Sequence, residues 1–285
     1  MATGSNPHLE LNDGATIPQL GFGVYQIDPG ETSAAVARAL DAGYLHVDTA
    51  RAYRNESAVG EAVRASGRDV YVTTKYFEPD VAHGHDDALA AFEESFRNLG
   101  LDRIDLYLVH WPTGVGEGYT ASWTALTELA DDERVRSIGV SNFTAEHLEK
   151  AVAATGVTPT VNQVELHPYF QQRDLRAVHA EHGIVTEAWA PLGQGAVLDD
   201  PTLAEIGREH GKTVAQVVLR WHLQLGIVVI PKSVTPSRIT ENIEVFDFAL
   251  SEDEMTAIEG LERGERIGPD PATFVMPVGG PSGNA

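Results

Sequence analysis

The chain has 285 residues, is 42% apolar, contains no cysteine and carries a formal net charge of −22 at pH 7. The missing cysteines exclude a disulfide framework, a thiolate metal site and a cysteine nucleophile. The acidic balance argues against nucleic acid as a partner, because phosphate binding needs a basic face. With no apolar run near the roughly 20 residues of a membrane helix and no signal-peptide pattern at the N-terminus, we expect a cytoplasmic protein without membrane contact.

The predicted elements begin with a hairpin, because Asn12, Asp13 and Gly14 separate two short apolar runs at 8–11 and 15–17. Eight strand-like runs then alternate with eight segments of helical period. The strands are predicted at 19–23, 45–48, 70–74, 104–109, 137–140, 161–166, 184–189 and 227–230. The helices are predicted at 32–42, 56–65, 86–99, 122–130, 146–154, 173–181, 214–225 and 238–244.

This alternation predicts βαβ units around a parallel sheet, and eight units fill an α/β (β/α)8 TIM barrel. The hairpin is expected to cap the barrel bottom, and a further helix is predicted at 251–261, followed by a loop rich in Gly and Pro. No linker divides the chain, so we expect one domain over 1–285. A doubly wound sheet is the alternative, but Gly21 and Gly23 are not followed by the third glycine of its fingerprint.

Polar residues gather where the predicted strands end, which in a TIM barrel is the face that carries the active site. Each has a simpler interpretation by itself: Asp48 and Thr49 as a helix-cap pair, a lysine as a solvated flank, a histidine as a structural residue. Their common position around one mouth favours function. They are Asp48, Lys75, His110, Ser141, Asn142, Gln163, Trp189 and Lys232.

Three of these side chains, Asp48, Lys75 and His110, make one chemical set with Tyr53 in the loop after the second strand. A phenol has a pKa near ~10 and is a poor acid at neutral pH, and an adjacent ammonium is expected to lower that value. Asp48 offsets the cost of burying Lys75, and a neutral imidazole orients a substrate oxygen. The set predicts protonation of an oxyanion as it forms, as in carbonyl reduction. It supplies no hydride, so a nicotinamide cofactor is implied.

With these residues the chain resembles the aldo-keto reductase family, in particular bacterial members similar to 2,5-diketo-gluconate and aldehyde reductases. The similarity runs from Leu11 to about Phe274 and rests on seven segments in order: HVDTARAYRNE, VTTK, LVHWP, GVSNF, VNQVELHPY, AWAPLGQG and IPKSVTPSRITEN. The family fold is a TIM barrel that binds NADP(H) without the doubly wound fingerprint, in agreement with the missing glycine. The resemblance implies NADPH-dependent reduction of small aldehydes, dicarbonyls or keto-sugars to alcohols.

The resemblance also implies roles for residues. Tyr53 would donate the proton, Lys75 and Asp48 would tune it, and His110 would orient the carbonyl. Ser141, Asn142 and Gln163 would hold the nicotinamide carboxamide, with Trp189 stacked on the ring. Further cofactor contacts would come from Gly23, Val24, Ala190, Pro191, Leu192, Gly193, Gln194, Gly195, Lys232, Ser233, Val234, Thr235, Arg238, Glu241 and Asn242. Many relatives have serine at the Ala190 position, so the resemblance does not carry over the hydrogen bond of that side chain.

Lys232 and Arg238 also stand out by themselves, because the chain has only four lysines and a strongly negative net charge. Arg matches a phosphate bidentately and Lys meets it as a point charge, so the pair predicts preference for NADPH over NADH. The alternative is a scattered pair on a solvated helix start.

Aromatic residues are expected to form the walls of the substrate pocket. They are Tyr25, Phe77, Trp111 and Phe274, and such walls suit small apolar or flat carbonyl compounds. The alternative is ordinary core. The short segment between Trp111 and Ser122 is rich in glycine, which favours an open mouth and broad substrate use.

The sequence also allows two other function classes. A metal-dependent barrel hydrolase is suggested by His46 and Asp48, which share a strand face, with His110 and His167 as further ligands. It leaves Lys75 and Gln163 without a role, so no metal is predicted. A histidine-rich loop at 83–87 is read as a helix cap. A non-catalytic NADP(H)-binding regulatory member is disfavoured by the complete catalytic set.

The remaining expectations concern charge and assembly. The acids are spread along the chain, as in proteins of a salt-rich cytoplasm, where screening removes self-repulsion; an ordinary acidic bacterial enzyme is the equal alternative. Arg51 and Arg54 are interpreted as rim charges that pair with acids such as Glu56, and the alternative is that Arg54 favours anionic substrates. By resemblance to the family we expect a monomer whose partner is a small-molecule carbonyl substrate.

Overall fold

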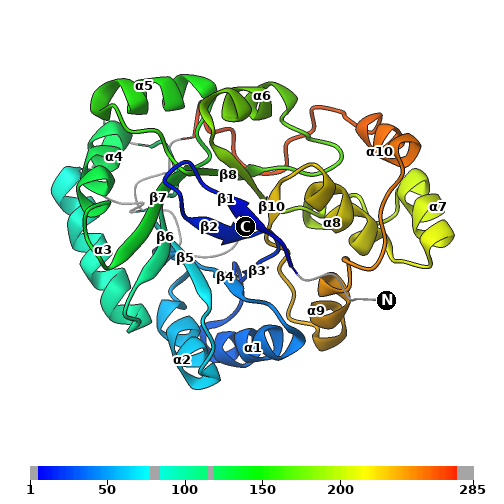
Figure 1. Ribbon diagram of the computed structural model, residues 1–285, viewed down its shortest axis with the longest axis horizontal. Helices are drawn as coiled ribbons and strands as arrows, with labels where there is room; N and C mark the ends of the chain where they lie inside the picture. Colours follow the sequence, from blue (N-terminus) through cyan, green and yellow to red (C-terminus); the bar gives the residue numbers. More distant parts are fainter. Residues whose placement is uncertain (1–5, 78–83, 114–117, 275–285) are drawn as a thin grey trace.

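The computed structural model describes residues 6–77, 84–113 and 118–274, and its centre is a parallel sheet rolled into a barrel (Figure 1). The strands follow one another in chain order around the sheet: β3 (Phe22–Gly23), β4 (His46–Asp48), β5 (Tyr71–Tyr76), β6 (Ile104–Val109), β7 (Val135–Ser141), β8 (Val161–Glu165), β9 (Val185–Trp189) and β10 (Val228–Val229). The barrel closes because the Val229 N–H donates to the Gln19 carbonyl at 2.9 Å and the Gly21 N–H donates to the Val229 carbonyl at 2.9 Å. The predicted barrel is therefore confirmed.

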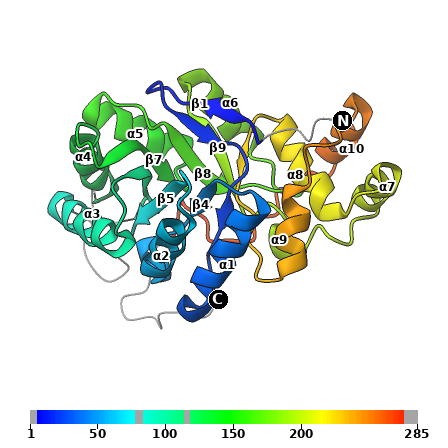
Figure 2. The same ribbon diagram turned by 60° about the horizontal axis from the view of Figure 1, so that its bottom comes forward.

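Helices surround this sheet on the outside, and their ring closes where α9 packs beside α1 (Figure 2). They are α1 (Pro29–Ala42), α2 (Glu56–Ser66), α3 (His85–Leu99), α4 (Gly118–Leu129), α5 (Ala145–Thr155), α6 (Arg173–His182), α7 (Pro201–His210), α8 (Val214–Gln224), α9 (Pro236–Ile243) and α10 (Glu252–Glu259). The additional helix predicted after the eighth unit is confirmed as α10. Among the described residues, no helix is long and apolar enough to cross a membrane.

One helix, α7, was not predicted. It begins at Pro201, whose fixed φ suits the first helical position, and the Asp200 carboxylate accepts hydrogen bonds from the N–H groups of Thr202 at 2.9 Å and Leu203 at 3.2 Å. It ends at Gly211 in the left-handed conformation that glycine adopts without strain. Both end signals are in the sequence, but the segment lies outside the simple alternation of one helix per strand.

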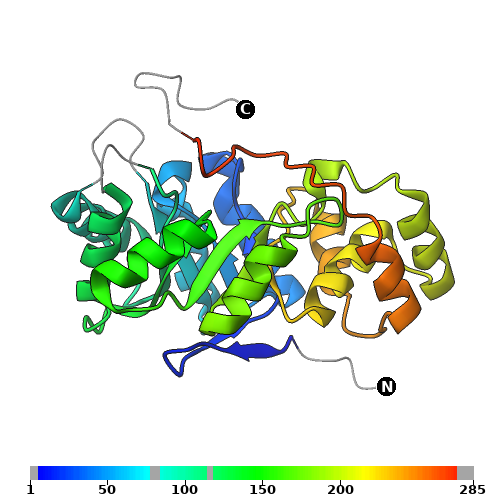
Figure 3. The same ribbon diagram turned by 90° about the horizontal axis from the view of Figure 1, so that it is seen from above.

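The two ends of the barrel differ. β1 (His8–Glu10) and β2 (Thr16–Pro18) form the predicted antiparallel hairpin, and Leu11 and Ile17 pack into the barrel interior against a small apolar cluster. Figure 3 shows this hairpin at one end and residues 263–274, here called the C-terminal strap, across the other end. The carboxyl ends of the parallel strands face the strap, so the candidate site lies between strands and strap.

Candidate active site

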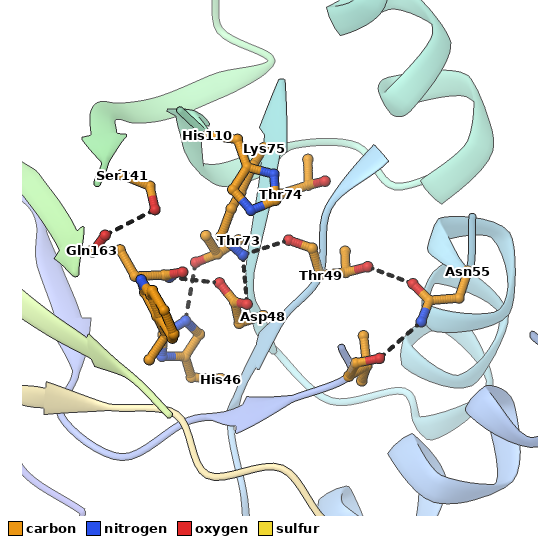
Figure 4. A network of polar contacts seen from close by, with 12 residues as sticks. His46, Asp48, Thr49, Asn55, Thr73, Thr74, Lys75, His110, Ser141 and Gln163 are labelled. Carbon is orange, nitrogen blue, oxygen red and sulfur yellow. Dashed lines mark hydrogen bonds and ion pairs between the residues drawn. The ribbon is translucent and has the colours of Figure 1, made fainter. Parts of the chain in front are cut away.

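Three of the predicted catalytic residues, Asp48, Lys75 and His110, converge at the carboxyl ends of β4, β5 and β6 (Figure 4), and the fourth, Tyr53, follows β4 in a short helix. Lys75, which is fully buried, donates to Asp48 Oδ1 at 2.6 Å and to the Thr49 carbonyl at 2.9 Å. Its ammonium lies 5.3 Å from the centre of the Tyr53 ring. The rings of Tyr53 and His110 meet edge to face with their centres 5.7 Å apart. The barrel thus brings an ion pair, a phenol and an imidazole into one cluster.

The loop after β4 is fixed by Asn55, a residue that the sequence analysis did not single out. Its side-chain oxygen accepts from Thr49 Oγ1 at 2.7 Å, and its amide nitrogen donates to the Val24 carbonyl at 3.1 Å. Arg54 adopts a left-handed conformation, with φ of 57°, that turns the chain sharply after Tyr53. These contacts hold the short helix Arg51–Tyr53 over the mouth of the barrel.

The pKa of Tyr53 shifts in the direction opposite to the one expected from the sequence. Burial and the nearby Asp48 carboxylate raise the pKa of Tyr53 well above 10, whereas Lys75 was expected to lower it. The reason is that Asp48 balances the ammonium at short range while the phenol remains desolvated. Burial and then Lys75 lower the pKa of His110 well below 6.5, so the predicted neutral imidazole agrees with the structure.

Glu187, a buried acid in β9, was not among the predicted site residues, although a charged residue inside an apolar strand is itself a sign of a functional position. It lies opposite Gln163 in the strand register, and neither carboxyl oxygen has a hydrogen-bond partner among the described residues. The Gln163 amide donates to Asp48 Oδ2 at 2.9 Å and approaches Glu187 without reaching hydrogen-bond geometry. Burial, then the Asp48 charge, raise the pKa of Glu187 to about 8. Burial also raises the pKa of Asp48, but Asp48 keeps the ion pair with Lys75, so Glu187 holds the proton at neutral pH.

Replacing Glu187 by glutamine is expected to stabilise the protein in a pH-dependent manner. In the folded protein the pKa of Glu187 lies above the ordinary 4.5. The wild type therefore has its full free energy of unfolding below pH 4.5 and loses part of it as the pH rises toward 8. The glutamine has no proton to lose, so the free energy of unfolding of the variant does not fall in this way. It should exceed that of the wild type by near zero at acidic pH and by roughly 3–5 kcal/mol at about pH 9. Urea unfolding at several pH values measures it, with the exposed Glu265→Gln as control. An offset equal at every pH contradicts the assignment.

The residues expected at the nicotinamide form a connected network beside this cluster. Asn142 Nδ2 donates to the His110 carbonyl at 3.0 Å, and Asn142 Oδ1 accepts from Trp189 Nε1 at 2.8 Å. Ser141 Oγ donates to the Gln163 carbonyl at 2.8 Å. Asn142 holds a left-handed backbone conformation, with φ of 64°, a strained state that structures keep at functional sites. The four side chains therefore share one wall of the mouth.

The segments expected at the phosphates and the adenosine lie on the adjoining side. There are two such segments, 190–195 and 232–242. The backbone of the first adopts left-handed conformations at Ala190, Gly193, Gln194 and Gly195. In the second segment Ser233 Oγ accepts from the Thr235 N–H at 3.1 Å just before α9. Lys232 and Arg238 are exposed, and neither forms an ion pair with any described residue. Other predicted contacts here are Gly23, Val24, Pro191, Leu192, Val234, Glu241 and Asn242, of which Glu241 accepts a hydrogen bond from Thr213 Oγ1 at 2.8 Å.

The four aromatic residues expected in the substrate pocket lie around the cluster of predicted catalytic residues. The ring centres of Tyr25 and Tyr53 are 4.9 Å apart, and those of Phe77 and His110 are 5.9 Å apart. Trp111 packs on Phe274 of the strap, with ring centres 4.5 Å apart. Tyr25 is 49% exposed, so its ring borders on solvent. Residues 114–117 of the glycine-rich segment that follows Trp111 lie outside the described residues.

The two arginines beside Tyr53, Arg51 and Arg54, differ in their ion pairs. Arg51 pairs with Glu94 at 2.7 Å. Glu56 is buried and accepts from Thr74 Oγ1 at 2.7 Å. Arg54 is exposed and forms no ion pair within the described structure. Among described residues there is no group of three or more His, Asp or Glu side chains placed to hold a metal ion; His83 of the histidine-rich loop lies outside them.

Comparison with known proteins places the chain in a family. A model of the aldo/keto reductase family matches residues 19–263. An aldo-keto reductase of Mycolicibacterium smegmatis is 52% identical over 272 residues, covering 94% of this chain and 98% of that protein. The methylglyoxal reductase DkgA of Yersinia pestis is 48% identical over 273 residues, with 94% and 97% covered. A solved structure, a mutant of Gox0644 in complex with NADPH, aligns with a TM-score of 0.91 at 48% identity, covering 95% of this chain and 99% of that one. The chain belongs to the aldo/keto reductase family of oxidoreductases.

Proposed function

We propose that this protein reduces small aldehydes, dicarbonyls or keto-sugars to alcohols with NADPH, in the cytoplasm and as a monomer. The observation that carries the proposal is the convergence of Tyr53, Lys75, Asp48 and His110 at one mouth of the barrel. A proton donor beside a neutral hydrogen-bonding imidazole is the equipment that a developing alkoxide needs.

The residues around this mouth fit NADPH. Ser141, Asn142 and Gln163 offer amide and hydroxyl groups where a carboxamide needs both donors and acceptors. Lys232 is the one lysine of the four, all of which lie in the described part of the chain, that has no carboxylate partner. Together with Arg238 it would hold the 2′-phosphate. A Cβ added to Gly23 would come within 3.1 Å of the Ile230 carbonyl and 3.7 Å of Lys232 Cβ, so the end of β3 lies beside this segment.

When bound, NADPH supplies the hydride that the side chains cannot provide. His110 is neutral, so it can donate a hydrogen bond to the substrate carbonyl oxygen and orient it. Tyr53 then gives its proton to the oxygen as negative charge develops there. Its raised pKa keeps the phenol protonated over the physiological range, and Lys75 takes over the stabilisation of the phenolate once the proton has left. Glu187 enters this balance as a neutral group.

The substrate class is supported by the walls of the pocket and by a relative. Phe77, Trp111 and Phe274 offer flat apolar surface around His110, which suits small carbonyl compounds. A methylglyoxal reductase is 48% identical to the chain, which makes dicarbonyls the first compounds to test.

The experiment that tests the proposal follows NADPH absorbance in the presence of the purified protein and a small aldehyde or dicarbonyl, with and without a chelator. We expect consumption that the chelator does not affect. Loss of consumption in the presence of the chelator would assign the reaction to a metal-dependent site, and NADPH binding without consumption across a broad carbonyl panel would favour a regulatory member.

Arg238→Ala is expected to lower the preference for NADPH over NADH. The loss of one charge-assisted contact with a phosphate costs about 1.5–3 kcal/mol, so KM for NADPH should rise by about tenfold or more, while KM for NADH should change little. Steady-state kinetics with both cofactors measure the ratio. Arg97→Ala on α3 is the control for charge. An unchanged ratio would contradict the placement of the 2′-phosphate.

A further inference from the structure

The C-terminal strap contacts the barrel near its start, at its middle and at its end. At its start the Arg263 guanidinium lies 3.5 Å from the centre of the Tyr169 ring, and the Arg263 N–H donates to the Tyr169 carbonyl at 3.1 Å. At its end Phe274 packs on Trp111. The middle attachment is formed by Glu165, a residue at the end of β8 that has no role in the proposed proton transfer.

Glu165 is fully buried and meets the backbone of the strap directly. Its Oε1 accepts from the Ile267 N–H at 2.6 Å and its Oε2 from the Gly268 N–H at 2.8 Å, while His167 Nε2 lies 3.1 Å from Oε1. Burial acts to raise the pKa of Glu165, but these three contacts outweigh it and the net effect lowers that pKa. We call the carboxylate with its two backbone N–H partners the Glu165 clasp; its bonds are of the strong, charge-assisted kind.

The clasp adjoins Trp189. Glu165 and Trp189 are partners in the register of β8 and β9. A Cβ added to Gly268 would lie 2.5 Å from Trp189 Cη2 and 2.9 Å from Glu165 Oε2, so the strap can lie this close to the indole only with glycine at that position. At its other edge the indole donates to Asn142. The ring is therefore fixed on one side by the nicotinamide network and on the other by the strap.

We propose that Glu165 is a positioning residue for the cofactor: by clasping the strap at Ile267 and Gly268 it keeps the Trp189 indole in the plane on which the nicotinamide rests. The cofactor half of this proposal rests on the proposed function; the clasp itself does not. Loss of the clasp frees the middle of the strap, lets the indole move, and weakens NADPH binding at a place remote from the 2′-phosphate contacts.

The test compares Glu165→Gln with the wild type in two measurements. In the variant one carboxylate oxygen becomes an amide NH2 that faces a backbone N–H, so a bond is lost. Without cofactor, hydrogen exchange at Ile267 and Gly268 should be accelerated by about tenfold or more. The Kd for NADPH, followed by protein fluorescence, should rise by about tenfold, with a much smaller change of kcat at saturating NADPH, since the proton-transfer groups are untouched.

Two further variants keep the test decisive. Glu265→Gln removes the same charge from an exposed position on the strap, 3.7 Å from Arg263, and should leave both measurements unchanged. Gly268→Ala keeps the Glu165 carboxylate but inserts a methyl group 2.5 Å from the indole and 2.9 Å from Glu165 Oε2, so it should also weaken NADPH binding. It replaces Glu165→Gln in the test if that variant does not fold. Faster exchange with an unaltered Kd would overturn the coupling to the cofactor, and unaltered exchange would overturn the clasp. If the wild type itself fails to bind NADPH, the proposed function is wrong, and the exchange measurement still decides the clasp.

Discussion

Tyr53→Phe is expected to reduce kcat for carbonyl reduction by about a hundredfold to ten-thousandfold, the usual contribution of a positioned general acid. The substitution removes only the hydroxyl, so the ring contacts with Tyr25 and His110 and the packing of the loop are preserved. The Kd for NADPH should therefore change little. The raised pKa of the phenol predicts further that wild-type kcat does not fall through ionisation of Tyr53 below pH 10.

The matched control for this variant is Tyr71→Phe. Tyr71 also points into the barrel, and its buried hydroxyl has no hydrogen-bond partner among the described residues, so its removal should leave kcat close to that of the wild type. Equal losses in the two variants would mean that the barrel interior, and not the Tyr53 proton, limits the rate. Full activity in Tyr53→Phe would assign proton donation to another group.

Lys75→Met is expected to abolish reduction and to lower the free energy of unfolding by about 3–5 kcal/mol, because it leaves the Asp48 carboxylate buried without its cation. At present Asp48 has two donors, Lys75 at 2.6 Å and Gln163 at 2.9 Å. The cost should shrink toward acidic pH, where Asp48 takes up a proton in the folded state instead.

The double variant Lys75→Met/Asp48→Asn separates charge from packing. It removes both ions, so we expect it to regain most of the lost stability while remaining inactive. Urea unfolding of the four proteins of this cycle gives the coupling energy between the two residues. Additive effects would contradict the account of a mutually dependent buried pair.

The sequence was sufficient for the barrel because the alternation of apolar strands and amphipathic helices is a local pattern. It was also sufficient to place Asp48, Lys75 and His110 together, since the carboxyl ends of parallel strands meet at one face. Both inferences need only periodicity and topology. The unpredicted α7 breaks the one-helix-per-strand pattern, although Asp200, Pro201 and Gly211 mark its two ends.

Other features depend on the folded environment and were not predictable in this way. The direction of the Tyr53 pKa shift is set by desolvation and by the distance to Asp48, neither of which a sequence contains. Glu187 is a neutral acid only because the barrel buries it beside another carboxylate. The Glu165 clasp joins residues 102 and 103 positions apart along the chain, and its donors are backbone N–H groups, which every residue except proline has.

The most direct measurement of the central claim is a single turnover with NADPH that carries deuterium at the transferable position of the nicotinamide, a small dicarbonyl and excess enzyme. We expect wild-type enzyme to place one deuterium on the carbinol carbon of the product, and Tyr53→Phe, with the same cofactor bound, to do so far more slowly. NADPH oxidation without deuterium in the alcohol, or equal rates in the two proteins, would contradict it.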